Sequence, residues 1–140
     1  METVKAYQTK AKKLPGTRYV EVRKKAFDLY TIIKKRSKRR AYIRSAYFNK
    51  EKIFLSLFWD HLADKHHKDR TRRLKYFPCA LELIRQTKFD PTSVENVDRK
   101  SEILHRFVGI TAESEIFYVQ IKENKRNGQK YLMSVFPQGK

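Results

Sequence analysis

Three stretches near the end of the chain alternate apolar and polar side chains with a period of two residues. They read EILHRFVGI, EIFYVQIK and QKYLMSVF, and the polar residues 111–114 and 123–128 separate them. This period is typical of β-strands, because successive side chains of a strand point to opposite faces of its sheet. Short polar connections between such stretches indicate hairpins. Residues 102–137 therefore predict a three-stranded antiparallel meander.

Three segments upstream of these strands repeat their apolar side chains with a helical period. The first is residues 19–34, where basic side chains lie opposite the apolar stripe. The second, NKEKIFLSLFWDHLADKHH, begins at Asn49, a residue type favoured at N-caps, and carries Phe58 on the face expected to cover the sheet. The third, KDRTRRLKYFPCALELIRQ, contains Pro78, which breaks or kinks a helix because proline lacks an N–H. The sequence thus predicts an α+β fold with N-terminal helices packed on a C-terminal three- to four-stranded antiparallel sheet.

Two polar stretches are predicted to lack regular structure. Residues 1–16 are polar and end in Pro15-Gly16, so we expect a mobile lead-in. Residues 89–101, FDPTSVENVDRKS, contain an Asp-Pro turn signal and are expected to form a loop.

Positive charge is concentrated in the first third of the chain. The net charge is +18; residues 1–50 contain 16 Lys and Arg against 3 Asp and Glu, while residues 51–140 contain 17 against 12. This distribution predicts a basic N-terminal arm and helix (residues 1–50) followed by an α+β domain (residues 51–140). Such a charge favours a polyanionic partner, with nucleic acid ahead of an anionic membrane surface.

The densest basic run is KKRSKRR, residues 34–40, in which six of seven side chains are cationic. It is interpreted either as a solvated helix end, where cations suit the helix dipole, or as a phosphate-binding patch. Aromatic residues follow it directly, which favours the second interpretation. The candidate nucleic-acid-binding residues are Lys34, Lys35, Arg36, Lys38, Arg39, Arg40, Lys125, Arg126 and Lys130.

The neighbours His105 and Arg106 must point to opposite faces of the predicted sheet. Arg106 lies on the same side of the predicted strand as three apolar residues, Leu104, Val108 and Ile110. We therefore expect Arg106 on the core face and His105 on the exposed face. The predicted register then gathers His105 with Tyr118, Gln120, Lys122, Lys130 and Ser134. This set is either a solvated face or an active site for metal-free RNA cleavage, which needs a base, an acid and cations on the phosphate.

Other motifs exclude several classes of protein. A single cysteine, Cys79, forbids an intrachain disulfide and fits a reducing, cytoplasmic setting. No apolar stretch suits a secretory signal or a membrane span, so no membrane partner is expected. His61, His66, His67 and Cys79 match no zinc pattern, and no glycine-rich phosphate loop occurs, so no metal or cofactor is expected.

Residues 50–137 resemble a known group of small nucleases. The strands LHRF, VQIKENK with its basic tail, and YLMSVFP, together with FWDHLADK and RRLKYFPCALELIR, resemble the barnase–EndoU–colicin–RelE-like nuclease domains of phage, mobile elements and toxin systems. The resemblance implies a metal-independent ribonuclease that often leaves a cyclic phosphate. It implies that His105 is the first-strand histidine, Lys122 the middle-strand cation and Ser134 the last-strand hydroxyl, and Tyr118 lies beside them in the predicted register.

The sequence therefore predicts a metal-independent endoribonuclease whose candidate catalytic residues are His105, Lys122, Ser134 and Tyr118. The toxin of a toxin–antitoxin pair is one form of this function, and the expected partners are RNA and an antitoxin protein. The alternative is a non-catalytic nucleic-acid-binding protein that uses the same basic surface. An enzyme requires His105, Lys122 and Ser134 to converge on one phosphate, whereas a binder requires only accessible positive charge.

Overall fold

The computed structural model describes residues 5–139. The helices are α1 (Tyr19–Arg36), α2 (Ser56–Ala63), α3 (His67–Leu74) and α4 (Phe77–Gln86). The strands are β1 (Tyr7–Gln8), β2 (Tyr42–Ser45), β3 (Glu51–Phe54), β4 (Thr92–Glu95), β5 (Glu102–Ile110), β6 (Ile116–Asn124) and β7 (Lys130–Pro137).

The seven strands form one mixed sheet in the order β1-β5-β6-β7-β3-β2, with β4 paired to β5 beside β1. The antiparallel meander of β5, β6 and β7 is present as predicted. The prediction of a three- to four-stranded antiparallel sheet preceded by all the helices is wrong, because β1 and β3 pair in parallel with β5 and β7, and three strands precede α2. The additional strands have two to four residues each, too few for a period of two to stand out.

A hairpin replaces the start of the second predicted helix. Residues 42–54 form β2 and β3, and Asn49 and Lys50 take positive φ angles of 56° and 67° in the turn between them. Asn49 is therefore a turn residue rather than an N-cap, in keeping with the tolerance of asparagine for left-handed backbone. The helix begins only at Ser56, and its Phe58 is 2% exposed in the core, as predicted.

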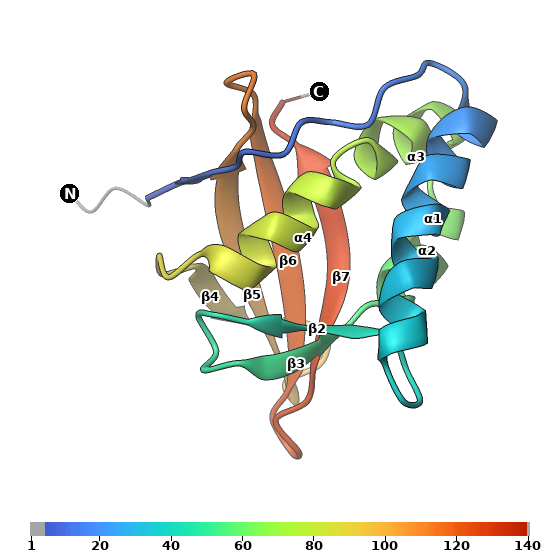
Figure 1. Cartoon of the computed structure of the whole chain (residues 1–140). Helices are drawn as coiled ribbons and strands as arrows, with labels where there is room; N and C mark the ends of the chain where they lie inside the picture. Colours follow the sequence, from blue (N-terminus) through green and yellow to red (C-terminus); the bar gives the residue numbers. More distant parts are fainter. Residues whose placement is uncertain (1–4, 140) are drawn as a thin grey trace.

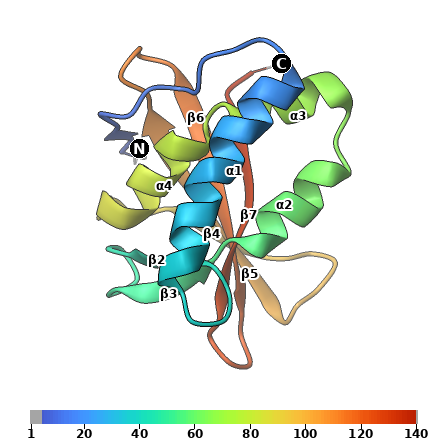
Figure 2. The ribbon, with the colours of Figure 1, turned by 45° about the vertical axis from the view of Figure 1, so that its right-hand side comes forward.

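The helices lie on one side of the curled sheet (Figures 1 and 2). There α1 and α4 cover one face, while α2 and α3 lie beside β7. Val22 of α1, Ile84 of α4 and Phe117 of β6 belong to one hydrophobic cluster. One core thus draws on residues from both sides of position 50, and the division into an arm and a domain stays a prediction.

Residues 5–16 pass along the outside of α4 as a strap (Figure 1). Glu82 of α4 accepts hydrogen bonds from the Tyr7 hydroxyl and from the backbone N–H groups of Lys10 and Ala11. Burial alone would raise the pKa of Glu82, but these donors outweigh it and hold the pKa below its ordinary value. The mobile lead-in is therefore wrong for residues 5–16, while residues 1–4 lie outside the described part.

A β-bulge in β7 changes which of its side chains face the core. Gln120 pairs with Ser134 and Ile121 pairs with Leu132, so Met133 is an extra residue. Before the bulge Lys130 and Leu132 face the helices, and after it Val135 does so. The prediction that Lys130 shares the exposed face with Ser134 is wrong, because a strict period of two cannot cross an inserted residue.

Candidate nucleic-acid interface

The two faces of β5 are the reverse of the prediction. His105, Phe107 and Gly109 pair with the buried Ile121, Val119 and Phe117, and His105 is 7% exposed. Arg106 pairs with Gln120 on the opposite face and is exposed. Gly109 shows why this register holds, because a Cβ there would lie 2.4 Å from the Phe117 ring and 2.8 Å from Leu83 of α4. Only the glycine set of β5 can pack this closely under the helix.

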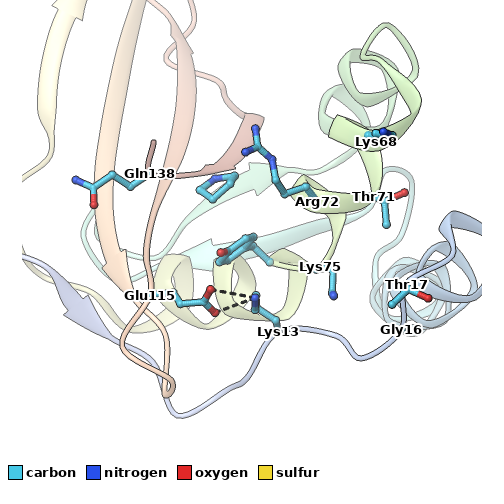
Figure 3. A pocket seen from close by; sticks show the side chains of 11 residues that line it. Lys13, Gly16, Thr17, Lys68, Thr71, Arg72, Lys75, Glu115 and Gln138 are labelled. Atoms are coloured by element: carbon cyan, nitrogen blue, oxygen red, sulfur yellow. Dashed lines mark hydrogen bonds and ion pairs between the residues drawn. The ribbon is translucent and has the colours of Figure 1, made fainter. Parts of the chain in front are cut away.

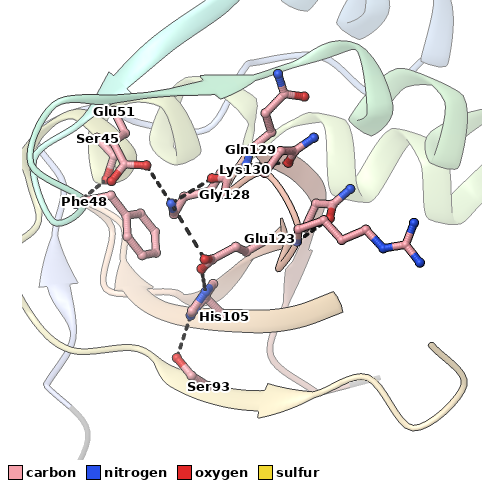
Figure 4. A network of polar contacts seen from close by, with 12 residues as sticks. Ser45, Phe48, Glu51, Ser93, His105, Glu123, Gly128, Gln129 and Lys130 are labelled. Atoms are coloured by element: carbon pink, nitrogen blue, oxygen red, sulfur yellow. Dashed lines mark hydrogen bonds and ion pairs between the residues drawn. The ribbon is translucent and has the colours of Figure 1, made fainter. Parts of the chain in front are cut away.

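His105 belongs to a chain of polar contacts on the core face (Figure 4). Its Nδ1 lies 2.6 Å from Ser93 Oγ and its Nε2 lies 2.8 Å from Glu123 Oε1. A carboxylate only accepts, so Nε2–H donates to Glu123, while Nδ1 and the Ser93 hydroxyl share the second hydrogen bond. The Phe48 ring packs against the imidazole at a centroid distance of 5.0 Å.

Lys130 continues this chain. Its Nζ lies 4.0 Å from Glu123 Oε2 and 2.7 Å from Glu51 Oε1, donates to the Gly128 carbonyl, and lies over the Phe48 ring. Lys130 is 5% exposed and its charge is paired, so it does not form part of an accessible phosphate-binding surface. We call the set Ser93, His105, Glu123, Lys130 and Glu51 the core-face polar chain. The order serine, histidine, carboxylate also occurs in hydrolases; here the three side chains connect β4, β5 and β6, and the Phe48 ring packs against the imidazole.

The opposite face, which we call the open face, is bordered along β7 by α2 and α3: Ser134 lines a small pocket with Phe58 of α2, and Arg73 of α3 lies over Phe136. Cross-strand partners on it are Arg106, Gln120 and Ser134 in one row, and Leu104, Lys122 and Tyr131 in the next. A third row contains Val108, Tyr118 and Phe136. The structure thus brings three of the predicted site residues, Tyr118, Lys122 and Ser134, to one face and leaves His105 on the other.

Aromatic rings continue across the open face onto the hairpin. Tyr131 pairs with Phe54, and Phe54 pairs with Tyr42; their ring centroids are 5.8 Å and 6.3 Å apart. Tyr118 and Phe136 form a second ring pair with centroids 5.3 Å apart. All five rings are half-buried, so each keeps part of its surface accessible.

Cationic side chains lie over these rings. The Arg40 guanidinium is 3.9 Å from the Phe54 ring centroid, and the Lys122 Nζ is 5.3 Å from that of Tyr131. The Arg106 guanidinium lies 5.4 Å from the Phe136 centroid and 5.7 Å from that of Tyr118. A cation over a ring gains quadrupole attraction without losing its net charge. Further cations over rings on this side are Lys52 and Arg44 over Tyr42 and Arg73 over Phe136.

Carboxylates are scarce on the open face. Glu102 Oε2 lies 3.4 Å from Lys122 Nζ, a pairing that reduces the charge available at Lys122. Within residues 5–139, Arg40 and Arg106 form no ion pair. Their charge is therefore available to an anion that approaches the open face.

The basic run divides between two places. Lys34, Lys35 and Arg36 form the last turn of α1, where they complement the helix dipole. Of the loop residues that follow, Arg40 reaches the open face through Phe54, and all six cations are exposed. In the β6–β7 connection, Lys125 binds Glu95 at 2.7 Å and Arg126 is exposed.

Several residues of the interface were absent from the sequence-based set. Phe54 was assigned to a helix and Arg106 to the core, and Tyr42 was only one of the aromatic residues that follow the basic run. In the turn at Asn49 and Lys50, only the asparagine is a residue type that indicates positive φ angles. Little in the sequence therefore indicated the hairpin that positions Tyr42 and Phe54. The face of Arg106 could have been inferred from Gly109. Gly109 lies on the same face of β5 as His105, and a glycine in a strand indicates close packing on its face, which leaves Arg106 on the other face.

No protein-family model, curated protein or solved structure matches the chain significantly. The resemblance to barnase–EndoU–colicin–RelE-like nucleases stays a prediction. Among the described residues, no group of three His, Cys, Asp or Glu side chains is arranged to hold a metal ion. No helix in the described range is long and apolar enough to cross a bilayer.

Proposed function

We propose that the chain binds single-stranded RNA along the open face. The observation that carries this proposal is the row of half-buried rings on β7, β3 and β2, with Lys122 and Arg40 over Tyr131 and Phe54. Unpaired bases stack on accessible aromatic rings, and cations beside the rings contact the phosphates. The net charge of +18 adds long-range attraction for any polyanion.

Binding is favoured over cleavage because of where His105 lies. An imidazole that shuttles protons must reach the 2′-hydroxyl or the leaving oxygen of the RNA. His105 is buried on the core face with both ring nitrogens in hydrogen bonds, on the other side of the sheet from Lys122 and Ser134. RNA cleavage, the antitoxin partner and the cytoplasmic location stay predictions from the sequence.

The experiment measures the fluorescence anisotropy of a labelled single-stranded RNA of about 16 nucleotides, a length that spans several stacking sites. We expect Tyr131→Ala and Phe54→Ala each to weaken binding about tenfold, since a base–ring stack contributes about 1–3 kcal/mol. Affinity should fall roughly ten- to a thousandfold between about 50 and about 200 mM salt, because several phosphate contacts release counterions.

The matched control is Phe89→Ala, which removes an aromatic side chain that is 38% exposed and lies outside the open face. This variant should bind RNA like the wild type. Equal affinity for single-stranded and fully duplex RNA would contradict stacking on the open face. Affinity for vesicles of anionic lipid that exceeds affinity for RNA would identify a membrane surface as the polyanion instead.

A parallel incubation of the same RNA in EDTA tests the cleavage alternative. Intact RNA is the expected result. Fragments that appear with the wild type and disappear with Lys122→Ala and Ser134→Ala would replace the binding proposal with a ribonuclease whose site lies on the open face.

A further inference from the structure

A second basic surface lies at the end of β7, next to the ring pair of Tyr118 and Phe136. It is a cleft of about 540 Å³ between the strap, α3 and the end of β7 (Figure 3). A volume of this size is in the range of small-molecule sites. Its lining includes Lys13 and Thr17 from the N-terminal side, and Pro137 and Gln138 from the end of β7. The cleft is therefore built by segments that are far apart in the sequence.

The lining of the cleft has an excess of positive charge. Lys68 and Arg72 of α3, with Lys75 at its C-cap, fall on one side of the helix because they are spaced by three or four residues. Lys13 is the fourth cation, and Glu115 is the one carboxylate among the described lining residues. Four cations facing one carboxylate leave a net charge that an anionic ligand would neutralise.

Two of these cations already have carboxylate partners. Lys13 Nζ lies 2.8 Å from Glu115 Oε1, and this hydrogen bond raises the pKa of Lys13 despite the opposing effect of burial. Arg72 lies 3.0 Å from Asp69 Oδ1, within α3 itself. Neither Lys68 nor Lys75 forms an ion pair with any carboxylate between residues 5 and 139. Their charges, with the Thr17 hydroxyl nearby, remain available to a ligand.

The cleft adjoins the open face. Gln138 lines the cleft, and its Nε2 donates to the hydroxyl of Tyr118 on the open face at 3.3 Å. Arg72 lines the cleft while its neighbour Arg73 lies over Phe136 of the open face. A strand that follows the rings can therefore reach the cleft where β7 ends.

We propose that the cleft binds a phosphate monoester, namely the terminal phosphate of a nucleic-acid strand that lies on the open face. A terminal phosphate carries nearly two negative charges, whereas a phosphodiester within the strand carries one. The unpaired charges of Lys68 and Lys75 therefore favour a strand end over the middle of a strand. This inference rests on the proposed RNA binding and adds a preference that the open face alone does not explain.

The test compares otherwise identical RNA strands that carry a 5′-phosphate, a 3′-phosphate or hydroxyl groups at both ends. We expect one of the phosphorylated strands to bind the full chain about tenfold more tightly than the hydroxyl strand, the effect of one charge-assisted hydrogen bond. The double variant Lys68→Gln/Lys75→Gln should abolish this preference while it still binds the hydroxyl strand. Uridine 5′-monophosphate should bind much more weakly than the preferred strand.

The matched control is Lys34→Gln/Lys35→Gln, which removes the same charge from an exposed turn of α1. It should weaken all three strands equally and keep the preference. Strands that bind without any terminal preference overturn the cleft proposal and leave RNA binding standing. Failure of every strand to bind overturns both proposals. If uridine monophosphate binds as tightly as the preferred strand, the ligand of the cleft is a free nucleotide and not the end of a strand.

A variant that should strengthen the preference provides an independent test. Glu115→Gln removes the carboxylate of the cleft and frees the ammonium of Lys13 for a ligand. We expect this variant to increase the ratio between phosphorylated and hydroxyl strands severalfold, since it adds a cation to the phosphate site. An unchanged or smaller ratio would show that the terminal phosphate does not enter the cleft.

Discussion

The two faces of the central sheet both carry cations and aromatic rings, but they differ in how far those cations are paired with carboxylates. On the core face, Lys130 is 5% exposed, and Glu51 and Glu123 neutralise it beside Phe48. On the open face, Arg40 and Arg106 lie over rings and form no ion pair with the described residues. A buried cation needs a carboxylate to offset its desolvation, whereas an exposed cation over a ring keeps its charge for a ligand.

This comparison shows why residue type alone misplaced the site. Lysine and serine occur on both faces, and in the sequence they look equally suited to chemistry on either face. Burial separates two of the candidate residues from the rest: His105 and Lys130 are buried beside partners on other strands, whereas Tyr118, Lys122 and Ser134 are half-buried on the open face and Ser93 is exposed on β4. The partners of a charged group therefore indicate its role better than its chemical type.

The largest difference between the faces should appear when phenylalanine is removed from each. Phe117→Ala on the core face should lower the free energy of unfolding by about 3–5 kcal/mol, because Phe117 is fully buried and a cavity would remain. Phe136→Ala on the open face should cost less than about 1 kcal/mol and instead weaken RNA binding. Urea unfolding and anisotropy measure the two effects. A large loss of stability from Phe136→Ala would mean that Phe136 packs into the core and that this part of the open face is not an accessible surface.

The neighbours His105 and Arg106 test the same division within one strand. His105→Ala should lower the free energy of unfolding by about 1–3 kcal/mol, because Glu123 and Ser93 lose their partner. Arg106→Ala should change stability little and weaken RNA binding about tenfold, the effect of one charge-assisted contact. Thermal melts and RNA titrations of both variants provide the measurements. Normal stability with altered RNA binding in His105→Ala would reverse the assignment of the two faces.

The smallest effect concerns the salt dependence of binding. Arg40→Gln should reduce the slope of log affinity against log salt by about one, because one phosphate contact is lost. Lys130→Gln should leave that slope unchanged, since Lys130 is buried and paired with Glu51 and Glu123 and does not contact phosphates. Titrations at several salt concentrations measure both slopes. A slope that falls equally in the two variants would erase the distinction between paired and available cations.

The regular parts of the fold were predictable and the irregular parts were not. The strands β5, β6 and β7 and the helix α1 are long enough for their periods to emerge from the sequence. The face of β6 was predicted correctly because Phe117, Val119 and Ile121 alternate without interruption. The strands β1 and β4 have no such period, and they exist because the edge of β5 offers backbone partners.

The prediction of the candidate site was wrong for the polar residues that are buried. Sequence patterns assign histidine and lysine to solvent, but His105 and Lys130 are stabilised inside by partners that are distant along the chain. Glu51 lies 79 positions from Lys130, so no local pattern could pair them. The bulge at Met133 had the same effect, because it moved Lys130 to the core face without a mark in the sequence.

The parallel pairing of β1 with β5 also has a consequence for synthesis. Tyr7 pairs with Gly109, so β1 is synthesised well before the strand with which it pairs. The meander of β5, β6 and β7 forms from adjacent hairpins and can assemble early, whereas β1 closes a very long loop. We expect the N–H of Thr9, bonded to the Ile110 carbonyl at 2.8 Å, to become protected later in refolding than the amides of β6. Pulsed hydrogen exchange would show whether the strap docks after the meander of β5, β6 and β7 has folded.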